Sequence, residues 1–166
     1  MDDVSFMKKA VEEAVSSFNR DDIPVGAVLV IGGELIDSSG NSSHTNSDYI
    51  SHAEAQLIRK NASLIKKAHK EGKKIVLYTT LEPCIMCLGM CVQSRISEII
   101  YSCPDPAGGA TDIKSTKEWS KKIWPRIKAG PMAKETYDLF MKYMHGKENW
   151  DDIRPYFEGI REDVLK

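Results

Sequence analysis

Two short motifs, His52-Ala53-Glu54 and Pro83-Cys84-Ile85-Met86-Cys87, constrain this chain of 166 residues more than any other feature. Each stands where a helix is expected to begin, the first after a polar stretch and the second after a short apolar run. One imidazole and two thiols are side chains that zinc favours, and Glu54 adds a carboxylate beside them. The fold must therefore bring two helix N-termini to one point.

The number of ligands indicates a reactive site. A closed structural zinc site takes four protein ligands, whereas His52, Cys84 and Cys87 provide three and leave one position for water. With Glu54 available to move protons, this set suits metal-assisted hydrolysis. Cys91 does not fit as a fourth ligand, because a helix rises about 10 Å between Cys84 and Cys91, while two sulfurs on one zinc lie at most about 4.6 Å apart. We expect Cys91 to be a buried thiol.

Each motif also has an ordinary interpretation when it is taken alone. Ser51-His52-Ala53-Glu54 fits a capping box, in which Ser51 caps the helix and Glu54 bonds back to it. Cys84 and Cys87 fit a dithiol redox motif between a strand and a helix. The presence of both motifs at helix starts favours a shared metal. Residues two apart on a helix point about 200° apart, so we expect His52 at the non-helical edge of the first turn.

Length and composition indicate one ordinary domain over residues 1–166, with a core that needs no disulfides. Lys and Arg total 23 against 24 Asp and Glu, so the molecule as a whole is not an evident polyanion binder. No apolar run approaches the roughly 20 residues that span a bilayer. We expect a cytoplasmic protein that has no membrane partner, and whose four cysteines are metal ligands or core thiols.

The hydrophobic pattern alternates between helical and strand periods. Helices are predicted at 3–19, from Ala53, at about 84–93 and at about 131–145, and strands at 25–30, 34–37, 75–78, 96–101 and 123–129. Gly32-Gly33 joins the first two strands as a hairpin, and the strand, helix and strand over 75–101 indicate a parallel crossover. We expect a three-layer α/β/α sandwich. Cys103, at the exit of a strand, is a candidate pocket residue.

The chain from Asp21 to Tyr101 resembles the zinc-dependent cytidine and nucleobase deaminase superfamily, whose signature includes H-x-E and P-C-x-x-C. The branch that it resembles most holds tRNA adenosine deaminases, guanine deaminases and fungal-type cytosine deaminases. The matching segments are Ile23–Val30, Gly40-Asn41, His52–Glu54 and Tyr78–Cys87. The resemblance implies a cytidine-deaminase-like fold with a central mixed five-stranded sheet, and a homodimer. It also implies a zinc ion on His52, Cys84 and Cys87, with Glu54 as the proton shuttle.

Three candidates for substrate binding follow. Asn41 matches a family asparagine that bonds the substrate, although an ordinary turn residue after Gly40 is the alternative. Backbone groups near Pro83 are expected to position the base. Trp150 lies in a C-terminal tail, residues 146–166, that either covers the site as in fungal-type cytosine deaminases or simply docks on the core. This tail carries six acidic and four basic residues, which disfavours phosphate binding.

We expect a hydrolytic deaminase of a free nucleobase, nucleoside or related aminated heterocycle, with ammonia as product. A tRNA-specific adenosine deaminase that forms inosine at the wobble position is the alternative. Residues 114–128 hold six basic and one acidic side chain, and five lysines lie within 66–74; these runs either contact RNA or are solvated surface. A third interpretation is a catalytically silent zinc-binding accessory subunit, against which the retention of Glu54 argues.

Overall fold

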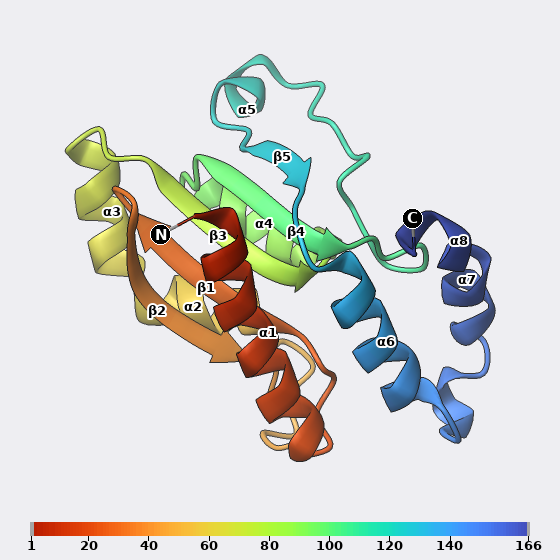
Figure 1. Ribbon diagram of the computed structural model, residues 1–166. Helices are drawn as coiled ribbons and strands as arrows, with labels where there is room; N and C mark the ends of the chain where they lie inside the picture. The colour runs from red at the N-terminus through yellow and green to blue at the C-terminus, as the bar shows by residue number, and fades with distance from the viewer. Residues whose placement is uncertain (1, 166) are drawn as a thin grey trace.

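The computed structural model describes residues 2–165 (Figure 1). In chain order its elements are α1 (Asp3–Asn19), β1 (Gly26–Ile31), β2 (Glu34–Gly40), α2 (Ala53–Lys60), α3 (Ala62–Lys70), β3 (Ile75–Leu81), α4 (Ile85–Gln93), β4 (Glu98–Cys103), α5 (Glu118–Lys122), β5 (Arg126–Ala129), α6 (Ala133–Met144), the 3-10 turn η1 (Glu148–Trp150), α7 (Arg154–Gly159) and α8 (Arg161–Val164).

One mixed five-stranded sheet organises the fold. Its strand order is β2-β1-β3-β4-β5, with β1 antiparallel to both β2 and β3, and with β3, β4 and β5 parallel. The predicted hairpin turns at Gly32 and Gly33, whose φ values of 61° and 87° favour glycine. The predicted crossover through α4 joins parallel strands, so the expectation of a mixed sheet is confirmed.

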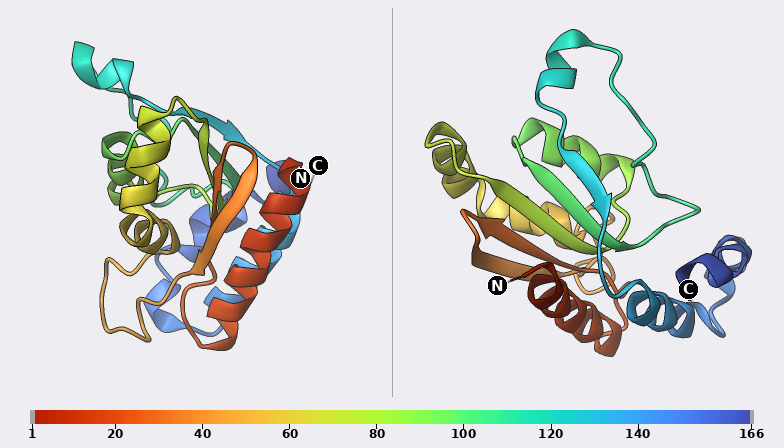
Figure 2. Two further views of the ribbon diagram at one scale, coloured as in Figure 1. Left: turned by 90° about the vertical axis from the view of Figure 1, so that its left-hand side faces the viewer. Right: turned by 45° about the horizontal axis from the view of Figure 1, so that its top comes forward.

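Helices cover both faces of this sheet. Helices α1 and α6 pack on one face, while α2, α3 and α4 pack on the other, as the left view of Figure 2 shows. The three-layer α/β/α sandwich predicted from the alternation of elements is therefore confirmed. The segment that holds α5 projects from the end of the sheet beside β5 (Figure 1).

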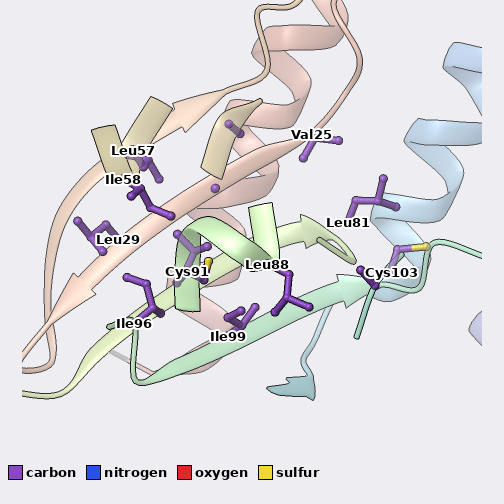
Figure 3. Close-up of a cluster of buried hydrophobic side chains, with 14 of the residues drawn as sticks. Val25, Leu29, Leu57, Ile58, Leu81, Leu88, Cys91, Ile96, Ile99 and Cys103 are labelled. Carbon is purple, nitrogen blue, oxygen red and sulfur yellow. The ribbon is translucent and has the colours of Figure 1, made fainter. Parts of the chain in front are cut away.

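The larger core cluster lies between the sheet and the layer of α2 and α4 (Figure 3). Leu29 and Ile99 from the sheet and Leu57 from α2 have no exposed surface. Burying one such side chain contributes about 1.5–3 kcal/mol. Cys91 lies fully buried in the same cluster, in agreement with its expected role as a core thiol.

A smaller cluster holds α1 against the opposite face, where Phe6 and Met7 pack on Val28. The backbone of β1 comes very close to this helix. A Cβ atom on Gly26 would lie 2.0 Å from the carbonyl oxygen of Ala10, so the contact requires a residue without a side chain.

Several element boundaries differ from those expected, and three have a clear cause. Strand β4 begins at Glu98, because the amide of Ile96 donates to Cys91 in the turn that leaves α4. Strand β5 begins at Arg126, because the amide of Ile123 belongs to the last turn of α5. The helix that starts at Ala53 is broken at Asn61, which separates α2 from α3. No helix within residues 2–165 is long and apolar enough to cross a membrane.

Candidate functional site

Two helix N-termini deliver the three predicted metal ligands. His52 is the N-cap of α2, with φ −70° and ψ 150°, and Cys84 is the N-cap of α4, with φ −69° and ψ 170°. Cys87 lies in the first turn of α4, and the two helices pack against each other. His52 therefore occupies the non-helical edge, as its spacing from Glu54 required.

The donor atoms are spaced as one zinc ion requires. The Nδ1 atom of His52 lies 3.7 Å from the Sγ of Cys84 and 3.6 Å from the Sγ of Cys87. A tetrahedral zinc with ordinary bond lengths separates a nitrogen and a sulfur ligand by about 3.6 Å. All three atoms lie within 4.8 Å of one another, and within residues 2–165 they form the single such group of three or more donors. The residues present therefore fit zinc.

Glu54 lies in the first turn of α2 with its carboxylate buried beside the donor atoms. Its Oε1 atom accepts a hydrogen bond of 3.1 Å from Thr79, and its Oε2 atom lies 3.5 Å from the Sγ of Cys87. The capping-box interpretation is wrong, because the hydroxyl of Ser51 donates to Asp48 and no side chain caps α2. Glu54 therefore does not take part in a capping box at the start of α2.

Burial and mutual hydrogen bonding shift the pKa values of the three donor side chains and of Glu54. A hydrogen bond from Cys87 lowers the pKa of Cys84 to about 4, and His52 reinforces this shift. The hydrogen bond to Cys84, together with burial, raises the pKa of Cys87. The contact with Cys84 raises the pKa of His52, and burial raises the pKa of Glu54. The thiol pair therefore retains a proton that a divalent cation replaces on binding.

A cavity of about 580 Å³ opens at these donors, which we call the central cavity. Of the candidate residues, Asn41, His52, Glu54, Cys84 and Trp150 line it. Pro83 does not, although its neighbours on both sides do, and its carbonyl accepts from Ala110. Cys103 is also absent from the lining, and its thiol donates to the carbonyl of Pro104.

The amide of Asn41 has a defined orientation. Its Oδ1 atom accepts hydrogen bonds from the backbone N–H and the hydroxyl of Ser43, at 2.9 and 2.6 Å. Its backbone carbonyl accepts from Ser17 and Arg20 at the end of α1, at 2.9 and 3.1 Å. The amide nitrogen is therefore the group that Asn41 keeps available as a donor.

The sequence analysis missed two carboxylates in the central cavity, Glu82 and Asp105. They follow the ends of β3 and β4, the edge of a parallel sheet where ligand sites concentrate. Glu82 accepts from the amides of Asp105 and Thr111, both at 3.0 Å, and Asp105 accepts from its own turn at Ala107 and Gly108. The signal that could have revealed them is their position just past a strand, Glu82 directly after β3 and Asp105 two residues after β4.

The C-terminal tail supplies one wall of the central cavity. Phe157 is buried and stacks on Phe140 of α6 at 4.9 Å between ring centroids. Trp150 packs edge-on against Phe140 and Tyr143, at 5.7 and 5.8 Å. The tail thereby holds Trp150 and Tyr156 at the edge of the cavity.

Comparison with known proteins identifies the family. The family described as "Cytidine and deoxycytidylate deaminase zinc-binding region" matches residues 1–103. The chain belongs to this deaminase family. The expectations of a zinc cofactor and of a hydrolase acting on carbon–nitrogen bonds are therefore confirmed, and the dithiol redox interpretation is set aside.

Individual relatives narrow the family further. A tRNA-specific adenosine deaminase of Agrobacterium fabrum is 40% identical over 144 residues, which are 86% of this chain and 93% of that protein. A solved structure from a study of tRNA:A34 deaminases is 34% identical, with a TM-score of 0.62 over 76% of this chain and 98% of that chain. The guanine deaminase of Bacillus subtilis is also 34% identical, with a TM-score of 0.54 over 63% of this chain and 66% of that chain.

These relatives correct our expectation about the substrate. We expected a free nucleobase or nucleoside as substrate and partner, with tRNA as the less favoured alternative. That expectation is wrong, because the relative from Agrobacterium fabrum, which matches 86% of this chain, and three further bacterial relatives are named as tRNA-specific adenosine deaminases. The acidic residues of the tail favoured a substrate without phosphates, but the charge of one segment does not identify the ligand of a cavity.

Proposed function

We propose that this protein is a tRNA-specific adenosine deaminase that converts adenosine to inosine at the wobble position. The observation that carries the proposal is the nearly full-length similarity to a protein of that name, combined with an open set of three zinc donors beside a buried glutamate. Water and adenosine would give inosine and ammonia, as a C–O bond forms and the exocyclic C–N bond breaks.

In the proposed mechanism, His52, Cys84 and Cys87 hold the zinc. Zinc held there supplies a Lewis acid that activates water for attack on the amine-bearing carbon of the purine. Glu54 would take the proton that water loses and deliver it to the ring nitrogen. It would then take the second proton, from the hydroxyl group on the attacked carbon, and pass it to the departing amine, which leaves as ammonia. Burial, which raises the pKa of Glu54, suits a carboxyl group that must both accept and return protons.

Asn41 recognises the base in this proposal. Because Ser43 occupies its Oδ1 atom, Asn41 presents an N–H donor to the central cavity, and adenine offers ring nitrogens as acceptors. We assign Pro83 only an indirect part, since it fixes the turn that leads into Cys84. The central cavity has four carboxylates, Glu54, Glu82, Asp105 and Asp152, and no lysine or arginine among its described lining residues. A base therefore suits it better than a phosphate.

We further propose that residues 1–166 form one deaminase domain whose tail covers the site, with Trp150 against the base. The tail side chains that line the central cavity support this arrangement. We also keep the homodimer as a proposal. Ile85 at the start of α4 is 69% exposed and can supply an apolar contact. A tRNA substrate would be met in the cytoplasm.

The experiment compares RNA with free bases. Zinc-loaded protein is incubated with an anticodon stem-loop that carries adenosine at the wobble position, and inosine is measured. In parallel, ammonia release is measured from guanine, cytosine, adenine and their nucleosides. The proposal expects inosine from the stem-loop alone. Ammonia from a free base without inosine in RNA would overturn it, and a silent protein with full zinc content would favour an accessory subunit.

A further inference from the structure

A buried hydroxyl group meets the carboxylate of Glu54 from the side of the sheet. Thr79 lies in the middle of β3 with no exposed surface, and its hydroxyl donates a hydrogen bond of 3.1 Å to the Oε1 atom of Glu54. It is the one hydrogen bond that this hydroxyl makes with residues 2–165. Thr79 does not line the central cavity and is not one of the metal donors, so it acts on the site through Glu54 alone.

The surroundings of Thr79 do not call for a hydroxyl group. Side chains alternate across a strand, so Leu77 and Leu81 lie on the same face of β3 as Thr79, and both belong to the core cluster of Figure 3. A buried hydroxyl is unfavourable in apolar surroundings unless it forms a hydrogen bond, and a valine would fill nearly the same space without that cost. The acceptor on Glu54, and not packing, therefore explains why position 79 carries a hydroxyl.

This hydrogen bond fixes the orientation of the carboxyl group of Glu54. The terminal torsion of a glutamate is broad and roughly two-fold, so a carboxyl group without a partner could turn either oxygen toward the metal donors. Thr79 binds Oε1, which leaves Oε2 facing the donors, 3.5 Å from the Sγ of Cys87. The hydroxyl of Thr79 has no second acceptor among the described residues, so its hydrogen points to Oε1. A proton carried by Glu54 then has its place on Oε2.

We propose that Thr79 is the positioning residue of Glu54: its hydroxyl holds Oε1, so that Oε2 faces the metal donors and is the atom that exchanges protons with the substrate. The proposal rests on the role of Glu54 in the proposed function, and it deepens that function by assigning the proton transfers to one oxygen atom. Because Thr79 lies outside the cavity lining, its hydroxyl should affect the rate of the reaction and not the binding of the substrate.

Substitutions at Thr79 test the hydroxyl directly. Thr79→Val keeps the shape of the side chain and removes the hydrogen bond, whereas Thr79→Ser keeps the hydroxyl. Deamination is measured with the substrate, RNA or free base, that the wild type accepts. The kcat of Thr79→Val should fall about 10-fold to 150-fold, the range for one hydrogen bond to a charged group, while KM stays within about twofold. Thr79→Ser should keep kcat within about threefold of the wild type.

Thr80→Val is the matched control. Thr80 is the next residue of β3, is equally buried, and accepts one hydrogen bond of 3.0 Å from the amide of Gly26, away from Glu54. Its loss should lower the melting temperature and leave kcat unchanged. Thr79→Ala, which opens space instead of filling it, should show the same fall in kcat as Thr79→Val.

Two readouts do not depend on activity. Every variant should retain one zinc per chain, because neither threonine is a metal donor. A crystal structure of Thr79→Val should show that the carboxyl group of Glu54 has left its wild-type orientation, while His52, Cys84 and Cys87 keep their positions.

Several outcomes would overturn the role of Thr79 while the wild type still deaminates its substrate. They are a wild-type kcat in Thr79→Val, an equal loss of kcat in Thr79→Ser or Thr80→Val, loss of zinc from Thr79→Val, and an unchanged carboxyl group in its crystal structure. A wild type that deaminates a free base and forms no inosine in RNA would overturn the proposed function and not the role of Thr79. A wild type that deaminates neither would overturn both.

Discussion

The Nδ1 atom of His52 lies 3.6 Å from the Sγ atom of Cys87, although the two residues are 35 positions apart in the chain. The contact exists because α2 and α4 pack together with their N-termini at the same edge of the sheet. A helix N-terminus favours negative charge, so this position also favours the thiolate form of Cys84. The packing of α2 on α4 therefore brings the three metal donors together.

Zinc content distinguishes the three-ligand site from a four-ligand one. Cys87→Ala should lose most of its zinc, because two donors cannot hold the ion as three do. Cys91→Ala should retain one zinc per chain, because Cys91 lies in the core and outside the donor group. Metal analysis of both purified variants beside the wild type makes the comparison. Zinc loss in Cys91→Ala with the fold intact would mean that this thiol is a ligand.

Replacing the carboxyl of Glu54 separates proton transfer from metal binding. Glu54→Gln keeps the size of the side chain and removes its ability to take a proton, so kcat should fall about 10²-fold to 10⁴-fold. Zinc content should stay unchanged, because Glu54 is not one of the three donors. Inosine formation and metal content are measured on the same preparation. Activity near that of the wild type would exclude Glu54 as the proton shuttle.

The buried carboxylate of Asp22 should make stability depend on acid. Burial raises its pKa, but hydrogen bonds from Thr45 and His44 outweigh burial and leave the pKa below its usual value. The ionised form therefore stabilises the fold above about pH 4, and this contribution is lost as pH falls through the lowered pKa. Asp22→Asn should lose about 1–3 kcal/mol at neutral pH.

Urea unfolding of Asp22→Asn and the wild type from pH 6 to pH 3 measures this effect. The difference between the two proteins should narrow as the pH falls. Asp112→Asn is the control, because Asp112 is exposed and makes no hydrogen bond or ion pair with the described residues. A difference that stays constant or widens in acid would show that Asp22 stabilises the loop in another way.

The close approach of α1 to β1 should make Gly26 intolerant of any side chain. Gly26→Ala places a methyl group 2.0 Å from the carbonyl oxygen of Ala10, so the helix must move, at a cost of about 1–3 kcal/mol or more. Gly159→Ala, where a Cβ meets nothing within 4 Å, should leave stability within about 1 kcal/mol of the wild type. Thermal unfolding compares the three proteins, and equal melting of Gly26→Ala and Gly159→Ala would contradict the packing described.

The regular parts of the fold could be predicted because their signals are local. The amphipathic period of α1 and the glycine pair of the hairpin each depend on neighbouring residues alone. Helix α3 and the first residues of β4 and β5 were not predicted correctly, because they depend on which backbone amide donates to which carbonyl. Pattern alone does not separate a strand residue from the last turn of a helix.

The site also has parts that local sequence predicts and parts that depend on tertiary contacts. The spacing of His52, Cys84 and Cys87 indicated shared coordination, since both motifs stand at helix starts. For the cavity wall, only the family resemblance suggested Trp150, and Asp105 was missed. Both side chains reach the wall through tertiary contacts, Asp105 through Glu82 and Trp150 through Phe140. The substrate could not be read from charge either, because the acidic tail and the basic runs favour opposite conclusions.

X-ray absorption at the zinc edge of the purified protein tests the central claim most directly. An open site made by His52, Cys84 and Cys87 predicts two sulfur scatterers at about 2.3 Å and two nitrogen or oxygen scatterers at about 2.0–2.1 Å, one of them from exchangeable solvent. An inhibitor that displaces water should change the lighter shell alone. Three or four sulfur scatterers, or a lighter shell that no ligand can exchange, would mean a closed site and would contradict the assignment of hydrolytic chemistry to this centre.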